Sequence, residues 1–189
     1  IRKELGIAWE GYMIFFHGSP YPENIMGVKR LAYVLKKLNN MGIEVIGLVA
    51  GNFKRKPTRS PYIVYLDYVK DLPKYINAAD VALLPVYPKS LGLRTRVVEY
   101  LACGLPTITT SDAVKGIDFI LKYNCVIIAD TLNEMVRAAA TLLKDEALRE
   151  TMSKNARVAA EKHFSPEVIS SRLESVYMRL LNKTTRIAR

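Results

Sequence analysis

Residues 81–109 have the sequence VALLPVYPKSLGLRTRVVEYLACGLPTIT, which contains one complete strand–helix–strand pattern. Two short apolar runs, Val81–Leu84 and Pro106–Thr109, are typical of strands that are buried on both faces. Between them, Arg94–Ala102 carries apolar residues at helical spacing, and Gly104 follows as a helix stop. A strand, a crossover helix and a second strand together form the βαβ unit of a parallel sheet.

The same alternation extends in both directions from this unit. Residues 28–38 have apolar side chains every three or four positions, which predicts a helix that Gly42 ends. After the sixth strand-like run the chain becomes wholly helical, and its last helix begins at Ser165-Pro166-Glu167. We therefore expect an α/β fold, a Rossmann-like doubly wound parallel sheet of about six strands with C-terminal helices. The predicted strands are Tyr12–Phe16, Glu44–Val49, Tyr62–Leu66, Val81–Leu84, Pro106–Thr109 and Cys125–Ile128.

The composition of the 189-residue chain excludes several classes of protein. Half of the residues are hydrophobic, which is enough for a sizeable core and argues against a disordered chain. No apolar run approaches the ~20 residues that a membrane-spanning helix needs. The two cysteines, Cys103 and Cys125, exclude a disulfide scaffold and favour a reducing cytosol. The formal net charge of +10 leaves two kinds of partner open: a polyanion such as nucleic acid or a membrane, or a smaller anion.

The segment after the fourth strand has the most informative polar residues. Arg94, Thr95 and Arg96 occupy the start of the predicted helix, where the helix dipole disfavours cations. An anion held between free backbone N–H groups and the guanidinium groups would resolve this conflict. An ion pair between Glu99 and either arginine explains the pattern equally well. The residues alone leave both alternatives open.

Other polar residues give weaker signals. Gly18 follows the first strand and permits a phosphate to approach the backbone, but the glycine spacings of the dinucleotide motif and of the P-loop are absent, and a plain turn is an equal alternative. His17 and His163 lack companions at metal-ligand spacing, so we expect no metal site. The basic loop Lys54–Arg59 has one adjacent aromatic residue, Phe53, which argues against nucleic-acid binding.

In their order along the chain, these segments resemble the C-terminal, nucleotide-sugar-binding domain of retaining GT-B glycosyltransferases, in the mannosyl/glucosyltransferase-like group. The resemblance extends from about Met13 to Leu181. Its most specific part is VEYLACGLPTI at residues 98–108, and YLDYV at 65–69 and NAADVALLP at 77–85 precede it in the expected order. The closing helices also fit the family.

This resemblance implies roles for individual residues. Glu99 matches the second glutamate of the family's paired-glutamate motif, which accepts hydrogen bonds from the ribose of the donor. Tyr68 and Val69 fall where the base is held, and Gly18 and Ser19 fall in the loop that faces the diphosphate. The other predicted donor-binding residues are Gly51 and the residues around the helix start, Gly92, Leu93, Arg94, Thr95 and Arg96.

Two features depart from the family pattern. Leu91 stands where the first glutamate of the pair is expected, and the arginine and lysine common after the first strand are missing. The sequence Gly92-Leu93-Arg94-Thr95-Arg96 instead resembles a subset of these enzymes with Gly-x-Arg-x-Lys at this place. We therefore expect Arg94 and Arg96 to supply the diphosphate with the positive charge that the first loop lacks.

The resemblance implies a glycosyltransferase that moves a hexose from a nucleotide diphosphate sugar, such as a GDP- or UDP-hexose, to a glycan, lipid or small molecule, with no metal or cofactor. It also implies an N-terminal acceptor-binding domain that carries the main acceptor-side groups, so the catalytic residues stay unassigned. We expect residues 1–11 to be the linker from that domain, 12–182 the nucleotide-sugar-binding domain and 183–189 a basic tail. Alone, this domain should bind the donor without turnover.

Two alternatives differ in class from this interpretation. The loss of a glutamate at Leu91 is also compatible with a degenerate, non-catalytic GT-B domain, and the positive charge with a nucleic-acid-binding module. For a role in glycan or cell-envelope biosynthesis we expect a cytoplasmic location, with anionic lipid at the cytoplasmic face of a membrane as a target for the basic residues of 54–59 and 183–189.

Overall fold

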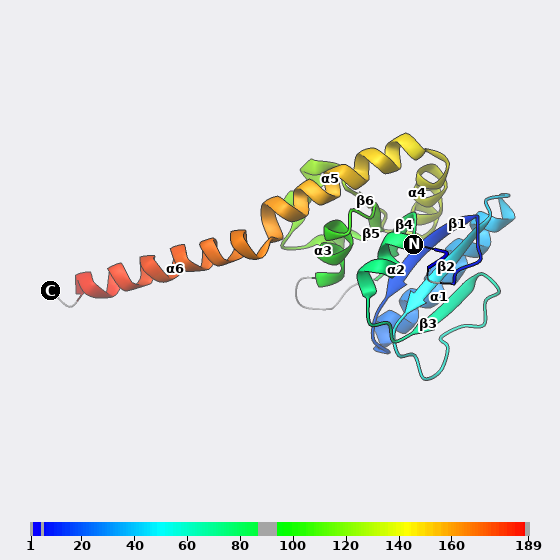
Figure 1. Ribbon diagram of the computed structural model, residues 1–189, viewed down its shortest axis with the longest axis horizontal. Coiled ribbons are helices and arrows are strands. Elements are labelled where there is room, and N and C mark those ends of the chain that lie inside the picture. The colour runs from blue at the N-terminus through cyan, green and yellow to red at the C-terminus, as the bar shows by residue number, and fades with distance from the viewer. Residues whose placement is uncertain (1, 5, 87–93, 188–189) are drawn as a thin grey trace.

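The computed structural model describes residues 2–4, 6–86 and 94–187, and its centre is a parallel sheet of six strands (Figure 1). The strand order is β3-β2-β1-β4-β5-β6, and every neighbouring pair is parallel. Each strand lies within one residue of its predicted range, so the predicted doubly wound sheet is confirmed. The strands are β1 (Tyr12–His17), β2 (Val45–Ala50), β3 (Ile63–Asp67), β4 (Val81–Leu84), β5 (Thr107–Thr109) and β6 (Val126–Ile128).

Helices cover both faces of this sheet. The first crossover helix, α1 (Pro22–Asn40), packs with α4 (Leu132–Lys144), which follows β6. The helix between β4 and β5, α3 (Thr95–Ala102), packs with α5 (Glu146–Phe164). The two pairs cover opposite faces, as right-handed crossovers that run in opposite directions require. Two short 3-10 helices, η1 (Ser111–Val114) and η2 (Asp118–Tyr123), connect β5 to β6. The α-helices are α1 (Pro22–Asn40), α2 (Leu72–Ala78), α3 (Thr95–Ala102), α4 (Leu132–Lys144), α5 (Glu146–Phe164) and α6 (Pro166–Ile187).

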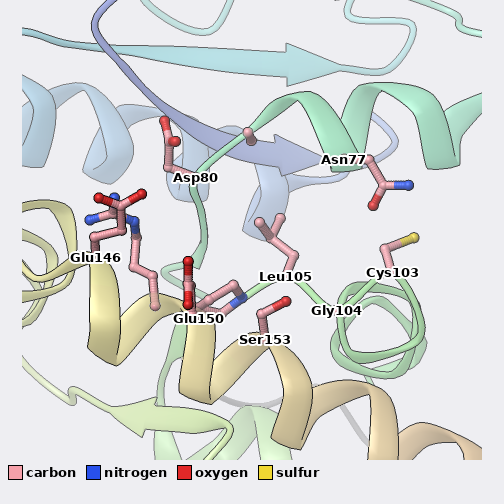
Figure 2. Close-up of a pocket in the computed structure, with 11 residues that line it drawn as sticks. Asn77, Asp80, Cys103, Gly104, Leu105, Glu146, Glu150 and Ser153 are labelled. Carbon is pink, nitrogen blue, oxygen red and sulfur yellow. The ribbon is translucent and has the colours of Figure 1, made fainter. Parts of the chain in front are cut away.

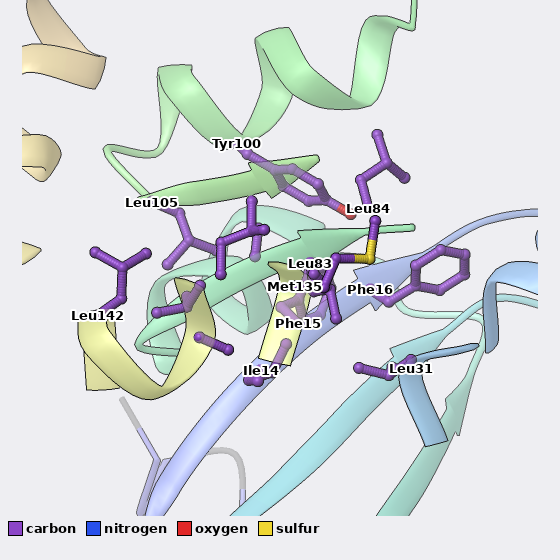
Figure 3. Packing of buried hydrophobic residues seen from close by; sticks show 14 of the residues in the cluster. Ile14, Phe15, Phe16, Leu31, Leu83, Leu84, Tyr100, Leu105, Met135 and Leu142 are labelled. Atoms are coloured by element: carbon purple, nitrogen blue, oxygen red, sulfur yellow. The ribbon is translucent and has the colours of Figure 1, made fainter. Parts of the chain in front are cut away.

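The core forms where the central strands meet helices on both sides (Figure 3). Ile14, Phe15 and Phe16 of β1 are completely buried, because this strand is central and covered on both faces. Tyr100 of α3 is also completely buried and meets the ring of Phe15 edge-on, with the ring centroids 6.1 Å apart. Tyr100 thus joins the first strand to the helix of the most specific motif.

The strand order reverses between β1 and β4, which are neighbours in the sheet although 63 residues lie between the end of β1 and the start of β4. From β1 the chain continues to β2 on one side, and from β4 it continues to β5 on the other. The loops that leave these two strands therefore diverge at the carboxyl end of the sheet, which is the usual ligand position in such folds.

The last helix, α6, extends away from the rest of the molecule (Figure 1). It begins after Ser165, whose hydroxyl accepts a hydrogen bond from the N–H of Val168, as the predicted helix start requires. Its apolar stripe is not part of the core, since the side chains along it are between 40% and 59% exposed. The stripe consists of Ile169, Leu173, Val176, Tyr177 and Leu180.

The segment before β1 lies against the other end of the sheet. The Arg2 guanidinium forms an ion pair with Asp80 at 2.7 Å and donates hydrogen bonds to the carbonyls of Gly11 and Ala78. Ile7 and Trp9 pack against the core. Residues that precede the first strand are thus attached at the amino ends of the strands, opposite the carboxyl ends where ligands usually bind.

Candidate donor-binding site at the strand reversal

A cavity of about 270 Å³ lies at the carboxyl ends of β1, β2 and β3. It brings together five residues that sequence reasoning assigned to donor binding: Gly18, Ser19, Gly51, Tyr68 and Val69. Tyr68 is 78% exposed, so one face of its ring is available to a flat ligand. Among the described residues, the lining consists of His17, Gly18, Ser19, Pro20, Ala50, Gly51, Asn52, Tyr68, Val69 and Leu72.

Two glycines allow the strand ends to approach each other closely. Gly51 has φ +138°, and a Cβ atom there would lie only 2.0 Å from the carbonyl oxygen of Gly18. The Gly51 N–H donates to the carbonyl of Asp67 at 2.7 Å, and the Gly18 N–H donates to the carbonyl of Ala50 at 3.0 Å. A Cβ on Gly18 would lie 2.9 Å from the side-chain nitrogen of Asn24. At both positions a side chain would clash, so the chain needs glycine where these strand ends meet beside the cavity.

Arg96 connects α3 to the loop after β1. Its guanidinium donates to the carbonyl of His17 at 2.7 Å and to Oδ1 of Asn24 at 2.8 Å, and it lies over the ring of Phe16. Asn24 in turn donates to the carbonyl of Ser19 at 2.8 Å. Burial lowers the pKa of Arg96 from its ordinary value. Oxygen atoms of the protein thus stabilise the positive charge of Arg96 at the helix start. Neither of the two alternatives suggested by the sequence predicted these partners.

Glu99 is paired with a histidine. Its Oε2 lies 2.9 Å from Nε2 of His17, so within the part of the chain that the structure describes, the alternative of a Glu99–arginine ion pair is wrong. The hydrogen bond from His17 lowers the pKa of Glu99, partial burial opposes this, and the charges of His17 and Arg96 add to the lowering. Glu99 is therefore an ionised acceptor beside the cavity, because His17 is one of the residues that line it.

Sequence reasoning missed the role of His17, and no local pattern reveals it. His17 and Glu99 are 82 positions apart, and only the adjacency of β1 and β4 brings the strand end to α3. The backbone N–H of His17 also donates to the hydroxyl of Tyr100 at 3.3 Å. Complete burial raises the pKa of that hydroxyl far above its ordinary value, so it stays neutral. The one available signal was the position of His17 at a strand end immediately before a glycine.

The other predicted residues are at the start of α3 or before it. Arg94 is the N-cap residue and is partly exposed, and Thr95 is the exposed first residue of the helix. Gly92 and Leu93, together with the departure from the family pattern at Leu91, lie outside the described residues. Within the described ranges, no group of three or more His, Cys, Asp or Glu side chains is arranged to hold a metal ion. Among the helices described, none is long and apolar enough to cross a membrane.

A second cavity of about 350 Å³ lies at the opposite end of the strands, between β4, β5 and α5 (Figure 2). Asp80, Cys103 and Ser153 line it, and none of the predicted donor-binding residues does. Burial raises the pKa of the Cys103 thiol, which opposes a nucleophilic role. Since ligands of parallel sheets bind at the carboxyl ends of the strands, the first cavity is the candidate functional site.

Comparison with known protein families shows to which family this chain belongs. Residues 11–145, more than half of the chain, match the family model described as Glycosyl transferases group 1. The chain belongs to this family. The resemblance to the C-terminal domain of GT-B glycosyltransferases is thereby confirmed at the level of family and fold, whereas the mannosyl/glucosyltransferase-like subgroup stays a prediction.

One curated relative and two solved structures illustrate the match, and the two structures do so at the level of the fold. The capsular polysaccharide biosynthesis glycosyltransferase CapM of Staphylococcus aureus is 26% identical over 84% of this chain and 44% of its own length. Among solved structures, Anabaena Alr3699/HepE in complex with UDP has a TM-score of 0.78 at 16% identity, over 94% of this chain and 51% of that one. The C-terminal domain of a group 1 family protein, LpcC of Francisella tularensis, has a TM-score of 0.68 at 14% identity, over 87% of this chain and 91% of that one. The chain spans about half the length of the curated relatives that it matches.

Proposed function

We propose that this chain is the donor-binding half of a retaining glycosyltransferase, which moves a hexose from a nucleotide diphosphate sugar to a glycan, lipid or small-molecule acceptor. The observation that carries the proposal is the cavity at the strand reversal, where residues of three separate strand ends meet beside the ionised Glu99. Membership in the group 1 family supports sugar transfer as the reaction. The UDP complex of a protein with the same fold supports a nucleotide as the ligand.

The chemistry of the cavity suits a nucleoside diphosphate. Exposed Tyr68 offers a flat apolar surface for the base, and the Glu99 carboxylate can accept hydrogen bonds from the hydroxyls of a vicinal diol. Gly18 and Ser19 leave room for phosphate oxygens near backbone. Arg94 and the N-terminus of α3 supply positive potential at the opposite side, where the leaving diphosphate gains negative charge. We propose that this preorganised potential, without a metal, stabilises the leaving group.

The proposed acceptor-binding domain would precede this one. The exposed stripe of α6 supports it, because an apolar helix face of this length is normally covered in a complete protein. The match to about half of each relative supports it as well. In this proposal residues 1–11 form the linker, the acceptor-side catalytic groups belong to the other domain, and this chain alone binds donor without turnover.

We further propose that the protein works on cell-envelope or other glycans at the cytoplasmic face of a membrane. CapM, a relative of this chain, is a capsular polysaccharide glycosyltransferase. The loop after β2 presents the exposed side chains of Lys54, Arg55, Lys56 and Arg59, next to cavity residue Asn52. Each cation near an anionic bilayer contributes about 1 kcal/mol of attraction, so four could hold the domain near a lipid-linked acceptor.

A thermal-shift and calorimetry panel tests the function. The probes are UDP, GDP, ADP, the corresponding hexose conjugates and a short oligonucleotide. Stabilisation by one nucleoside diphosphate and its sugar supports the proposal, and stabilisation by the oligonucleotide alone would favour the nucleic-acid alternative. Absence of binding by every probe would favour a degenerate domain and refute donor binding.

A further inference from the structure

The pairing of His17 with Glu99 goes beyond what the proposed function requires of Glu99 alone. We propose that His17 is a positioning residue: its Nε2–H holds Oε2 of Glu99, so that Oε1 stays directed to the ribose hydroxyls of the donor and the site selects ribonucleotides over deoxyribonucleotides. The inference rests on the proposed function, because it concerns the same donor site. It assigns a selectivity to a side chain that no sequence motif contains.

His17 is held more rigidly than Glu99. Its backbone belongs to the central strand β1, its N–H donates to Tyr100 and its carbonyl accepts from Arg96. Its ring lies edge-on to the ring of Tyr100, with centroids 5.3 Å apart, and tilted against Phe15 at 5.8 Å. The His17 side chain is 14% exposed, whereas that of Glu99 is 43% exposed. A carboxylate on an exposed helix flank is therefore fixed by a ring that itself cannot rotate freely.

The contacts also assign the proton on the ring. Nε2 faces the carboxylate at 2.9 Å and must carry a hydrogen to donate. Nδ1 is buried and has no hydrogen-bond partner among the described residues. A hydrogen on Nδ1 would be a buried donor without an acceptor among the described residues, so the contacts place the ring hydrogen on Nε2. The Glu99 carboxylate is then the acceptor of the pair.

One carboxylate oxygen is thus occupied, and the other has no hydrogen-bond or ion-pair partner among the residues that the structure describes. A carboxylate offers about four acceptor positions in total. The bond to His17 uses one position on Oε2 and orients the plane of the group, which leaves both positions of Oε1 for two neighbouring hydroxyls. Without the histidine, the side chain would rotate about its flexible bonds, and the diol would have to order it on binding.

The experiment compares nucleotides that differ only in the ribose hydroxyls. Calorimetry on this chain first identifies which of UDP, GDP and ADP binds most tightly, and the affinity for that nucleotide is then compared with that of its 2′,3′-dideoxy analogue. The variants are His17→Phe, which keeps a ring of similar shape but no donor, and His17→Gln, whose amide nitrogen can replace Nε2–H. The matched control is His163→Phe, since His163 contacts Tyr123 at 2.8 Å near the C-terminal end of α5 and does not line the cavity. Glu99→Ala serves as the reference for complete loss of the diol contact.

In His17→Phe, we expect the affinity for the ribonucleotide to fall roughly tenfold, as for loss of a charge-assisted hydrogen bond, and the affinity for the dideoxy analogue to stay unchanged. His17→Gln should restore most of the discrimination, and His163→Phe should retain all of it. Equal losses for both nucleotides in His17→Phe, or no loss for either, would overturn the positioning role while the proposed function stands. Unchanged discrimination in Glu99→Ala would overturn the ribose contact of Glu99 and with it the positioning role of His17, while donor binding itself stands. Failure of binding is the result that separates the two proposals. Failure of all three nucleotides to bind the wild-type chain would overturn both the proposed function and this inference.

Discussion

Replacing Gly51 by alanine tests how closely the strand ends must approach to form the cavity. A Cβ atom would lie 2.0 Å from the carbonyl oxygen of Gly18, far inside van der Waals contact. Both glycines directly follow strands and are held by backbone hydrogen bonds to neighbouring strands, so neither can move away easily. At φ +138° an alanine is also strained. Strain of about 1–3 kcal/mol and overpacking of about 1–3 kcal/mol together predict a loss of roughly 2–6 kcal/mol in the free energy of unfolding.

Urea unfolding followed by circular dichroism measures this loss. The matched control is Gly116→Ala, because Gly116 has φ +84° but nothing lies within 4 Å of its Cβ position. The control should lose only the strain of a left-handed residue, roughly 1–2 kcal/mol. The folded fraction of the Gly51→Ala variant should bind UDP more weakly, because the new Cβ atom displaces the Gly18 carbonyl beside the cavity. If Gly51→Ala were no more destabilising than Gly116→Ala, the close approach at the cavity floor would be refuted.

Four further predictions concern the residues around the cavity. Arg96→Ala should lower the free energy of unfolding by about 2–3 kcal/mol and weaken nucleotide binding, because the His17 carbonyl loses a charged donor; urea unfolding and calorimetry measure the two effects. Tyr100→Phe should cost about 1–3 kcal/mol in urea unfolding, since the partly buried N–H of His17 loses its acceptor. The pKa of Glu99 is lowered from 4.5 in the folded state, so ionised Glu99 stabilises the fold fully above pH 4.5, and this stabilisation is lost as the pH falls below that value. In Glu99→Gln, the free energy of unfolding measured in urea should therefore depend less on pH in this range. Arg94→Ala should weaken UDP binding by roughly tenfold and leave the melting temperature unchanged; unchanged affinity would contradict a diphosphate contact.

The sheet could be predicted from the sequence almost to the residue. Val81–Leu84 is the same range in prediction and structure, because a continuous apolar run between Asp80 and Pro85 allows few other interpretations. The strand order could not be predicted in this way, since it depends on which strand edges meet and not on any local pattern. The environment of α6 also escaped prediction, because periodicity identifies an apolar stripe without identifying what covers it.

The placement of two cavity residues at the carboxyl edge of the sheet was predictable from the sequence. Gly18 and Gly51 follow strands, and strand order alone then brings them together. The partner of Glu99 was not predictable, because helical spacing suggests an arginine three or five residues away, whereas β1 presents a histidine from outside the helix. Tyr68 and Val69 were assigned only through the family resemblance, which has no counterpart in propensity or periodicity.

Two arginines at the start of α3 suggested a shared role, yet their surroundings differ. Arg96 is bound to the His17 carbonyl and to Asn24, so its charge already stabilises the carboxyl end of β1 and the loop after it. Arg94 has no ion pair or side-chain hydrogen bond to another residue in the described ranges, and its side chain is partly exposed. The local charge available to a diphosphate is therefore that of Arg94 and the helix N-terminus, whereas Arg96 acts through the loop that it fixes. Because those contacts are made by the protein's own groups, the proposed donor would meet a rim that needs little further ordering. Such preorganisation is the condition for strong electrostatic stabilisation of a leaving group.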